Sequence, residues 1–288
     1  MNILITGIMG QVGFNLAHYF YLDKNNIFGT YHQKICTQFP SKLIDLSKDI
    51  FLSQQSFNHQ KLDLIIHCAA LTDVSFSENN PKLTNQINHL STQKLLSLAK
   101  KNNIPFIYLS TDFVFNGNLG DYNENSHTDP LSSYAKSKLY GEQAIQSYQK
   151  SIILRFTPIG HFLKLKHHNN SLIDWIIESS LSNTKIKLFY DKTFSPISSF
   201  EIFKTIQTLI LNNQFGLFHI ASECNSIYQA GRLIENIFHL NKIVIPCKFP
   251  KNDYSKIRPK YSHLSSKYLK SFKLKEILQN IKKQRESI

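Results

Sequence analysis

The sequence begins with M-N-I-L-I-T-G-I-M-G-Q-V-G, residues 1–13, and this stretch decides the fold. An apolar run suited to a buried strand leads directly into three glycines, Gly7, Gly10 and Gly13, and a helical pattern of apolar residues follows. Gly7 permits a tight turn, Gly10 lets the backbone approach a pyrophosphate, and Gly13 lets the helix pack closely on the strand. The free N–H groups and the dipole at a helix N-terminus favour an anion there. The stretch therefore predicts a dinucleotide-binding turn, and the alternative is an ordinary glycine-rich turn.

The rest of the first half alternates short apolar runs with longer helical patterns. Such alternation is typical of an α/β protein with a doubly wound parallel sheet, the Rossmann fold. We expect strands at Asn2–Thr6, Ile27–Tyr31, Leu62–Ala69, Pro105–Leu109 and Ser151–Arg155, and helices at Gln11–Leu22, Leu83–Lys101 and Ser132–Tyr148.

The pattern loosens after about residue 160. Helices are expected at Leu172–Leu181, Phe200–Leu211, Tyr228–Leu240 and Lys273–Lys283, and a strand at Phe215–Ala221, whereas 246–259 reads as irregular. We therefore predict a nucleotide-binding domain over residues 1–160. A smaller α/β substrate-binding lobe is expected over residues 161–288, with some elements returning to the main sheet.

Composition excludes several classes of protein. Of the 288 residues, 42% are hydrophobic, which is enough for a large core, yet no apolar run approaches the roughly 20 residues of a spanning helix. The N-terminus lacks the basic region of a signal peptide. Twelve histidines and four scattered cysteines show no metal-ligand spacing and no disulfide pattern. We expect a cytoplasmic protein with no metal site and no membrane partner.

The charge is strongly basic, with 33 Lys and Arg against 20 Asp and Glu, and it is concentrated after Lys242. A basic surface attracts anions. Lys256, Arg258 and Lys260 could pair with a nucleotide-sugar diphosphate, although a solvated lysine-rich face explains the same charge. No nucleic-acid-binding signature accompanies it, so we expect no nucleic-acid partner.

Two further motifs carry side chains suited to proton transfer. Tyr134 and Lys138 lie four residues apart on an expected helix, which puts them on one face. An ammonium beside a phenol lowers its pKa toward neutrality, so Tyr134 could give a proton to a carbonyl oxygen or take one back. Thr111, in the stretch Y-L-S-T-D-F-V-F-N-G at the end of an expected strand, would offer a hydroxyl to the same oxygen.

The G-x-x-G-x-x-G spacing resembles that of the extended short-chain dehydrogenase/reductase superfamily, and the chain resembles its dTDP-4-dehydrorhamnose reductase family. The residues that carry this resemblance are Thr6–Gly13, Ile65–Thr72, Ser110–Gly117, Tyr134–Glu142, Asp191–Pro196, Gly216–Ala221 and Arg258–Pro259. The resemblance implies a reductase that moves hydride from a nicotinamide cofactor to the 4-keto carbon of a nucleotide-activated 6-deoxysugar, in polysaccharide precursor synthesis. It also implies a sugar nucleotide as partner and leaves the oligomeric state open, with a homodimer as one possibility.

The resemblance assigns a role to each motif. Tyr134 would protonate the alkoxide as it forms, and Lys138 would adjust the pKa of Tyr134 and hold the nicotinamide ribose. Thr111 would orient the keto oxygen, and Asn88 would support the site. The implied cofactor-binding residues are Gly7, Gly10, Gln11 and Val12 at the pyrophosphate, Asp45 and Leu46 near the adenine, Cys68 packed beside the cofactor, and Ala69, Ala70 and Thr72 along the ribose and phosphates.

Departures from the family pattern bear on the cofactor and on the substrate. The stretch 30–34 has no acid to hold a ribose 2′-hydroxyl, and Lys34 could attract a 2′-phosphate, so NADP(H) is expected, with use of NAD(H) left open. Phe113 stands where related dehydratases carry a glutamate, which disfavours dehydration. The tryptophan that rhamnose-forming members of the family carry near Pro158 is absent. The resemblance therefore does not identify the sugar.

Two alternatives to a reductase stay open. Epimerases of the superfamily share the Thr, Tyr and Lys set. The family also contains a non-catalytic, NADP-binding regulatory subunit that binds a methionine adenosyltransferase. The intact set Thr111, Tyr134 and Lys138 favours catalysis, because a binding role does not need it.

Overall fold

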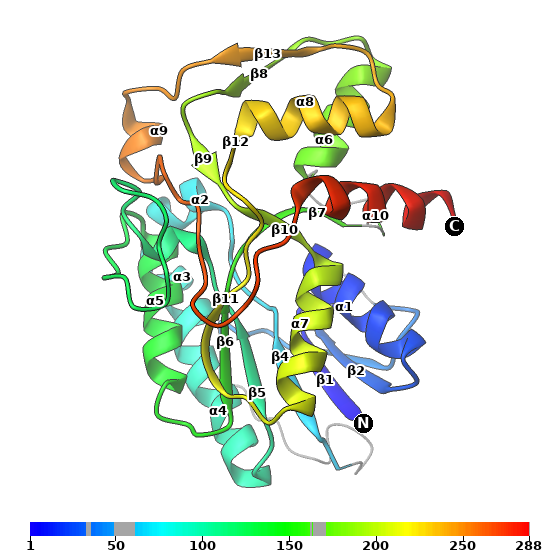
Figure 1. Ribbon diagram of the computed structural model, residues 1–288. Helices are drawn as coiled ribbons and strands as arrows, with labels where there is room; N and C mark the ends of the chain where they lie inside the picture. Colours follow the sequence, from blue (N-terminus) through cyan, green and yellow to red (C-terminus); the bar gives the residue numbers. More distant parts are fainter. Residues whose placement is uncertain (33–35, 49–60, 162, 164–170, 288) are drawn as a thin grey trace.

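The computed structural model describes residues 1–32, 36–48, 61–161, 163 and 171–287. Its centre is a seven-stranded, fully parallel sheet in the order β11-β6-β5-β4-β1-β2-β3 (Figure 1). The strands are β1 Asn2–Thr6, β2 Asn26–Tyr31, β3 Ser41–Leu43, β4 Leu64–His67, β5 Phe106–Leu109, β6 Ser151–Arg155 and β11 Gly216–His219. The predicted α/β fold with a doubly wound parallel sheet is confirmed.

Helices cover both faces of this sheet (Figure 1). On one face α1 (Gln11–Leu22) packs against α7 (Ser199–Leu211), and on the other α4 (Ser91–Asn102) packs against α5 (Ser133–Ile145). Alternate residues of the inner strands β1, β4, β5 and β6 enter two separate cores, because successive side chains of a strand point to opposite faces. This explains why the strand sequences are apolar throughout rather than alternating.

The expected helix Leu83–Lys101 is divided in the structure. It begins as α3 (Pro81–Asn85), continues as a π-helical turn, η2 (Gln86–Leu90), and ends as α4. The short helix α2 (Val74–Asn79) precedes it. A π turn inserts a residue into the helical ladder and is often found at functional sites, and apolar periodicity alone does not show it.

The second half adds several short elements above the carboxyl edge of the sheet (Figure 1). Three two-stranded sheets pair β7 with β10, β9 with β12 and β8 with β13. Between β10 and β12 the chain returns to the main sheet, where β11 pairs with β6. The elements are β7 Thr157–Gly160, α6 Leu172–Leu181, β8 Ile186–Phe189, β9 Thr193–Phe194, β10 Pro196–Ser198, β12 Asn225–Ser226, α8 Ile227–Phe238, β13 Val244–Cys247, α9 Asp253–Lys256 and α10 Leu274–Glu286.

The stretch 246–259, expected to be irregular, contains the end of β13 and all of α9, so that expectation was wrong in part. Strands of two or three residues are too short to show a period in the sequence. The boundary between residues 160 and 161 stays a prediction, and Lys34 lies outside the described residues. None of the described helices is both long and apolar enough to cross a bilayer.

Candidate active site

The turn between β1 and α1 has a backbone that only glycine fits. Gly7 has φ +63°, and a Cβ at this position would lie 2.7 Å from the Cα of Ala69. A Cβ on Gly13 would lie 2.5 Å from the Gly7 carbonyl oxygen. The turn therefore packs directly against the segment that follows β4, where Cys68 and Ala69 lie.

The first turn of α1 is suited to an anion. Gly10 caps α1 without any side-chain hydrogen bond, so the first N–H groups of the helix have no side-chain acceptor. Both polar atoms of the Gln11 amide are buried and have no hydrogen-bond partner among the described residues. Buried polar groups are nearly always paired, so an unpaired amide beside open N–H groups fits a site that receives the pyrophosphate of a dinucleotide.

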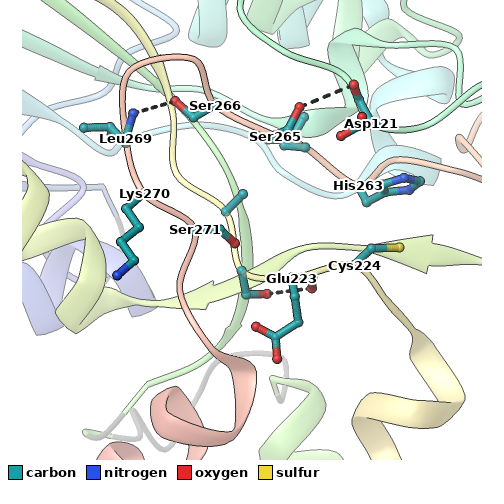
Figure 2. A pocket seen from close by; sticks show the side chains of 12 residues that line it. Asp121, Glu223, Cys224, His263, Ser265, Ser266, Leu269, Lys270 and Ser271 are labelled. Atoms are coloured by element: carbon teal, nitrogen blue, oxygen red, sulfur yellow. Dashed lines mark hydrogen bonds between the residues drawn. The ribbon is translucent and has the colours of Figure 1, made fainter.

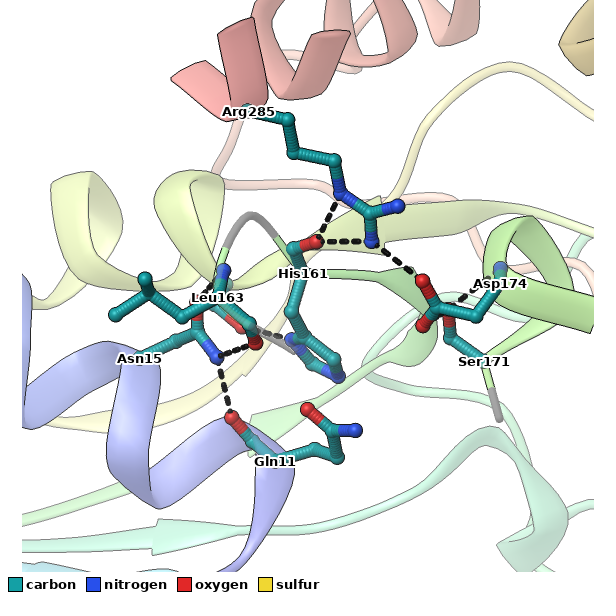
Figure 3. Close-up of polar contacts among 8 residues, drawn as sticks. Gln11, Asn15, His161, Leu163, Ser171, Asp174 and Arg285 are labelled. Carbon is teal, nitrogen blue, oxygen red and sulfur yellow. Dashed lines mark hydrogen bonds and ion pairs between the residues drawn. The ribbon is translucent and has the colours of Figure 1, made fainter. Parts of the chain in front are cut away.

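A polar network joins this turn to the C-terminal helix (Figure 3). The Asn15 side chain donates to the Gln11 carbonyl at 2.8 Å and exchanges two hydrogen bonds with the backbone of Leu163. The Arg285 guanidinium donates to the His161 carbonyl at 2.6 and 3.0 Å and forms a 2.8 Å ion pair with buried Asp174. These contacts fix the α1 end of the site against α10.

We expect Gly7→Ala to weaken NADPH binding at least about tenfold, because the left-handed backbone costs an L-residue about 1–2 kcal/mol and the methyl group meets Ala69. Fluorescence titration with NADPH measures this effect. Gly216→Ala is the matched control: Gly216 also has a positive φ, +128°, but no atom lies within 4 Å of its added Cβ. Equal losses of NADPH affinity in the two variants would contradict the assignment of the turn.

The other cofactor residues named from the sequence lie along the carboxyl edge of the sheet. Asp45 and Leu46 follow the edge strand β3, and the Asp45 carboxylate accepts hydrogen bonds from Ser47, which lower its pKa. Ala70 and Thr72 follow β4, half-buried and exposed respectively. Burial raises the pKa of the Cys68 thiol to about 12, so this cysteine is neutral and is not a nucleophile.

His67, at the end of β4, is part of the core. Its ring is 1% exposed, with Nδ1 2.6 Å from the Thr6 hydroxyl and Nε2 3.0 Å from that of Thr92. Burial lowers its pKa to about 3, so the ring stays neutral. His67 is thus a hydrogen-bonded residue of the core.

The structure brings Thr111 and Tyr134 together. Thr111 caps the short 3₁₀ helix η3 (Asp112–Val114) just beyond β5, and its hydroxyl donates to the Asp112 carboxylate at 3.2 Å. Its side chain is near enough to Tyr134, in the first turn of α5, to influence the pKa of that phenol. Lys138 follows one turn later, 4% exposed, with its ammonium 3.9 Å from the centre of the Tyr108 ring. Two hydroxyl groups that can hold one carbonyl oxygen thus lie beside a buried ammonium group.

The pKa of Tyr134 is raised, whereas the expectation was that it is lowered toward neutrality. Burial raises the pKa of Tyr134 to about 12, and the Thr111 side chain opposes this rise only in part. Burial likewise lowers the pKa of Lys138 to about 7, against the opposing pull of Glu142. Desolvation is the largest cause of both pKa shifts, so Tyr134 keeps its proton at neutral pH. The phenol is therefore suited to act as an acid.

Glu142 is a buried residue whose role the sequence did not show. Its carboxylate forms a two-point ion pair with Arg155 at 2.5 and 2.9 Å and accepts a hydrogen bond from Ser110. The side chains of Glu142 and Arg155 are only 6% and 5% exposed. The spacing of Glu142, four residues after Lys138, was the available signal, since that puts both on one face of α5.

Asn88 is hydrogen-bonded to α5, the helix that carries Tyr134 and Lys138. It lies in the π turn η2, 1% exposed, and its amide exchanges hydrogen bonds of 2.8 and 2.9 Å with the backbone of Leu71. The same amide donates to the Ser137 hydroxyl, which in turn donates to the Tyr134 carbonyl at 2.7 Å. Asn88 is thus connected to Tyr134, as expected of a residue that supports the site, and the connection runs through Ser137.

Replacing Asn88 by alanine is expected to lower kcat/KM about tenfold to a hundredfold, because Tyr134 loses its anchor to the cofactor side of the site. The unpaired backbone groups of Leu71 should also cost about 1–3 kcal/mol of stability. Steady-state kinetics and thermal unfolding measure both, with exposed Asn125→Ala as control. An Asn88→Ala enzyme that is less stable but fully active would show that the link to Tyr134 has no catalytic role.

The basic residues of the C-terminal stretch differ in their contacts. Lys256 and Lys260 form ion pairs with Asp253 and Asp191 at 2.8 and 3.0 Å. Arg258 reaches the first half of the chain, where it donates to the Ser75 hydroxyl at 3.0 Å.

The structure also has a pocket that lies apart from the candidate catalytic residues. Figure 2 shows a polar pocket of about 230 Å³ between the turn 221–224 and the segment 263–271, and none of its lining residues belongs to the candidate catalytic set. Within the part of the chain that the structure describes, no three His, Cys, Asp or Glu side chains are grouped so that they could hold a metal ion.

Comparison with known proteins identifies the family. A family model described as RmlD substrate binding domain matches residues 1–287, almost the whole chain. The chain belongs to this family, that of the dTDP-4-dehydrorhamnose reductases.

Several relatives are similar over different lengths of the chain. The probable low-salt glycan biosynthesis reductase Agl14 of Haloferax volcanii is 28% identical over 77% of this chain and 75% of its own. The dTDP-4-dehydrorhamnose reductase of Escherichia coli is 34% identical over 54% of this chain and 50% of its own. Methionine adenosyltransferase 2 subunit beta of Xenopus laevis is 31% identical over 53% and 45%.

Among solved structures, the dTDP-4-dehydrorhamnose reductase of Bacillus anthracis in complex with NADP superposes with a TM-score of 0.83 over 98% of each chain, at 23% identity. At that identity the likeness establishes the fold of this RmlD-family chain and no more.

Proposed function

We propose that this RmlD-family protein reduces the 4-keto group of a nucleotide-activated 6-deoxysugar with NADPH, in the synthesis of a polysaccharide precursor. The observation that carries the proposal is that Thr111, Tyr134 and buried Lys138 lie together beyond the carboxyl end of β5, two strands along the sheet from the glycine turn that follows β1. Family membership and the reductases among the relatives support it.

In this mechanism the chain supplies orientation and one proton. Thr111 and Tyr134 hold the keto oxygen between two hydroxyl groups. The bound nicotinamide cofactor supplies the hydride to the carbonyl carbon. As negative charge develops on the oxygen, Tyr134 donates its proton to it, and the resulting phenolate lies near the Lys138 ammonium. A phenol with a pKa of about 12 retains its proton until the much more basic alkoxide forms.

The protonated state of Tyr134 also bears on the two alternative functions, an epimerase and a regulatory subunit. An epimerase of this superfamily needs Tyr134 to remove a proton first, and a pKa of about 12 makes it a poor base at neutral pH. Phe113, whose ring meets the Tyr134 ring edge to face at 6.2 Å, cannot transfer the proton that dehydration needs. The relation to a methionine adenosyltransferase subunit supports a regulatory role, but such a role requires neither Thr111 nor Tyr134.

The proposed cofactor is NADP(H), and NAD(H) is the alternative cofactor for the same site. At the end of β2, Thr30 accepts a hydrogen bond from the Gly7 N–H, and the described residues that follow it, Tyr31 and His32, are not acidic. No carboxylate there would repel a 2′-phosphate. The related reductase solved with NADP supports this choice.

We further propose a cytoplasmic enzyme whose partners are small molecules, namely the sugar nucleotide and the cofactor, with no nucleic-acid partner. A homodimer is the proposed assembly, which sedimentation tests directly. A gel shift across a salt series tests for nucleic-acid binding, which would appear as steeply salt-dependent affinity.

The proposed activity is tested by NADPH oxidation against a panel of dTDP- and UDP-linked 4-keto-6-deoxysugars. We expect consumption of NADPH with at least one panel member and slower consumption of NADH. Binding of NADPH without turnover of any member, together with binding to a methionine adenosyltransferase, would favour the regulatory alternative.

A further inference from the structure

Rings and cations alternate along a strip that leads away from Tyr134. The Phe113 ring contacts the Tyr134 ring edge to face. The Lys192 ammonium lies 5.7 Å from the centre of the Phe113 ring and 4.7 Å from that of the Phe249 ring. Lys192 is therefore separated from the candidate proton donor by a single aromatic side chain.

The strip continues from Phe249 to a second cation. The rings of Phe249 and Tyr254 meet with their centres 6.0 Å apart, and the Arg258 guanidinium lies 4.1 Å from the centre of the Tyr254 ring. Arg258 also donates to Ser75 of α2, so the strip runs from the catalytic phenol to a contact between the two halves of the chain.

Lys192 is a buried cation without a local counter-ion. It is 6% exposed, and its ammonium forms no hydrogen bond or ion pair with the residues that the structure describes. The neighbouring Asp191 carboxylate is occupied by Lys260 at 3.0 Å and by the Phe249 N–H at 2.6 Å. Asp112 and Arg258 act on Lys192 only at longer range. A largely buried cation is stabilised when an anion pairs with it, so the Lys192 ammonium, which has no ion pair with the described residues, is suited to bind an anionic ligand.

The backbone around Lys192 is fixed on both sides. The Lys192 carbonyl accepts a hydrogen bond from the Ile227 N–H at 3.1 Å, and the Thr193 N–H donates to the Lys260 carbonyl at 3.1 Å. These bonds hold the backbone at the start of β9, so the fold fixes the position from which the Lys192 side chain extends.

We propose that Lys192 binds the diphosphate of the nucleotide-sugar substrate and thereby sets the distance between the sugar and the nucleotide. This inference rests on the proposed function, which places the sugar at Thr111 and Tyr134. A diphosphate carries enough negative charge for Lys192 and for Arg258 beyond it. Asp112, 2% exposed on the sugar side of Lys192, disfavours an anion closer to the reacting carbon. A carboxylate on the sugar itself is therefore the less favoured ligand.

The test measures binding of dTDP and of UDP by calorimetry, with no turnover involved. In Lys192→Gln we expect affinity for the better of the two to fall about tenfold to a hundredfold, the worth of a hydrogen bond to a charged group. Lys192→Arg should stay within a few-fold of the wild type. Affinity for thymidine or uridine should not change, since these ligands lack the phosphates. Inorganic pyrophosphate should displace the nucleotide from the wild type but not from Lys192→Gln.

Lys187→Gln is the matched control, because it removes one positive charge from an exposed position of β8, close in sequence. NADPH binding reports whether each variant is folded, and Lys192→Met provides a second neutral variant. Unchanged dTDP and UDP affinity in either folded neutral variant overturns the proposal, as does an equal loss in Lys187→Gln. Weakened diphosphate binding in a protein that reduces no 4-keto sugar would leave this inference standing while the proposed function fails.

Discussion

Tyr134→Phe is expected to lower kcat for 4-keto reduction by a factor of at least about 100, the usual worth of a positioned acid. The phenol is the group placed beside Thr111 to give a proton to the new alkoxide, and the phenyl ring keeps its shape without that proton. NADPH affinity should change little, because the glycine turn and the first turn of α1 are untouched. Steady-state kinetics with NADPH and the active sugar nucleotide give kcat, and fluorescence titration gives the NADPH affinity.

Tyr140→Phe is the matched control for this variant. Tyr140 lies on the same helix, α5, but is 44% exposed, so its loss should leave kcat within about twofold. A Tyr134→Phe enzyme that keeps wild-type kcat while Thr111→Val loses activity would show that another group delivers the proton.

Glu142→Leu is expected to destabilise the protein by about 3–5 kcal/mol. The substitution leaves the Arg155 guanidinium buried without its carboxylate, which is the costly way to break an interior ion pair. Glu142 also raises the pKa of Lys138. Without it this pKa falls further below its ordinary value, so Lys138 becomes neutral at pH 7. Urea unfolding measures the stability loss, and lowered activity of the folded fraction at pH 7, partly recovered at lower pH, reports on Lys138.

The double variant Glu142→Leu with Arg155→Met separates the two effects. Replacing both charges by apolar side chains should restore most of the stability, because no unpaired charge remains, whereas the effect on Lys138 persists. Exposed Glu276→Leu controls for loss of a carboxylate as such. A single variant as stable as the wild type would show that water reaches Arg155 and that the pair is not buried in solution.

The parts of the fold and of the site that could be predicted are those that a short run of sequence determines by itself. The glycine turn and the strands β1 and β5 follow from short runs of sequence whose period is clear, and the structure has them where predicted. The two-residue strands β9 and β12 have no period to detect. They nevertheless place Lys192, because β9 begins one residue after it.

The pKa shifts in the site could not be predicted from the sequence for a related reason. The spacing of Tyr134 and Lys138 indicated their common helix face but not how deeply the surrounding chain buries them. Burial reversed the expected direction of the Tyr134 pKa. The partner of Glu142 comes from β6, a strand that is adjacent only in the folded sheet. Such pairs depend on strand order, which no local pattern encodes.

The central claim is that this chain transfers hydride to a sugar carbonyl, and isotope transfer tests it most directly. The measurement uses NADPH deuterated at both hydrogens of nicotinamide C4, with NMR of the sugar-nucleotide product. We expect one deuterium at C4 of the sugar for each NADPH consumed, and at most about a hundredth as much with Tyr134→Phe at equal time. Loss of the 4-keto sugar without deuterium at C4 and without net loss of NADPH would contradict the claim.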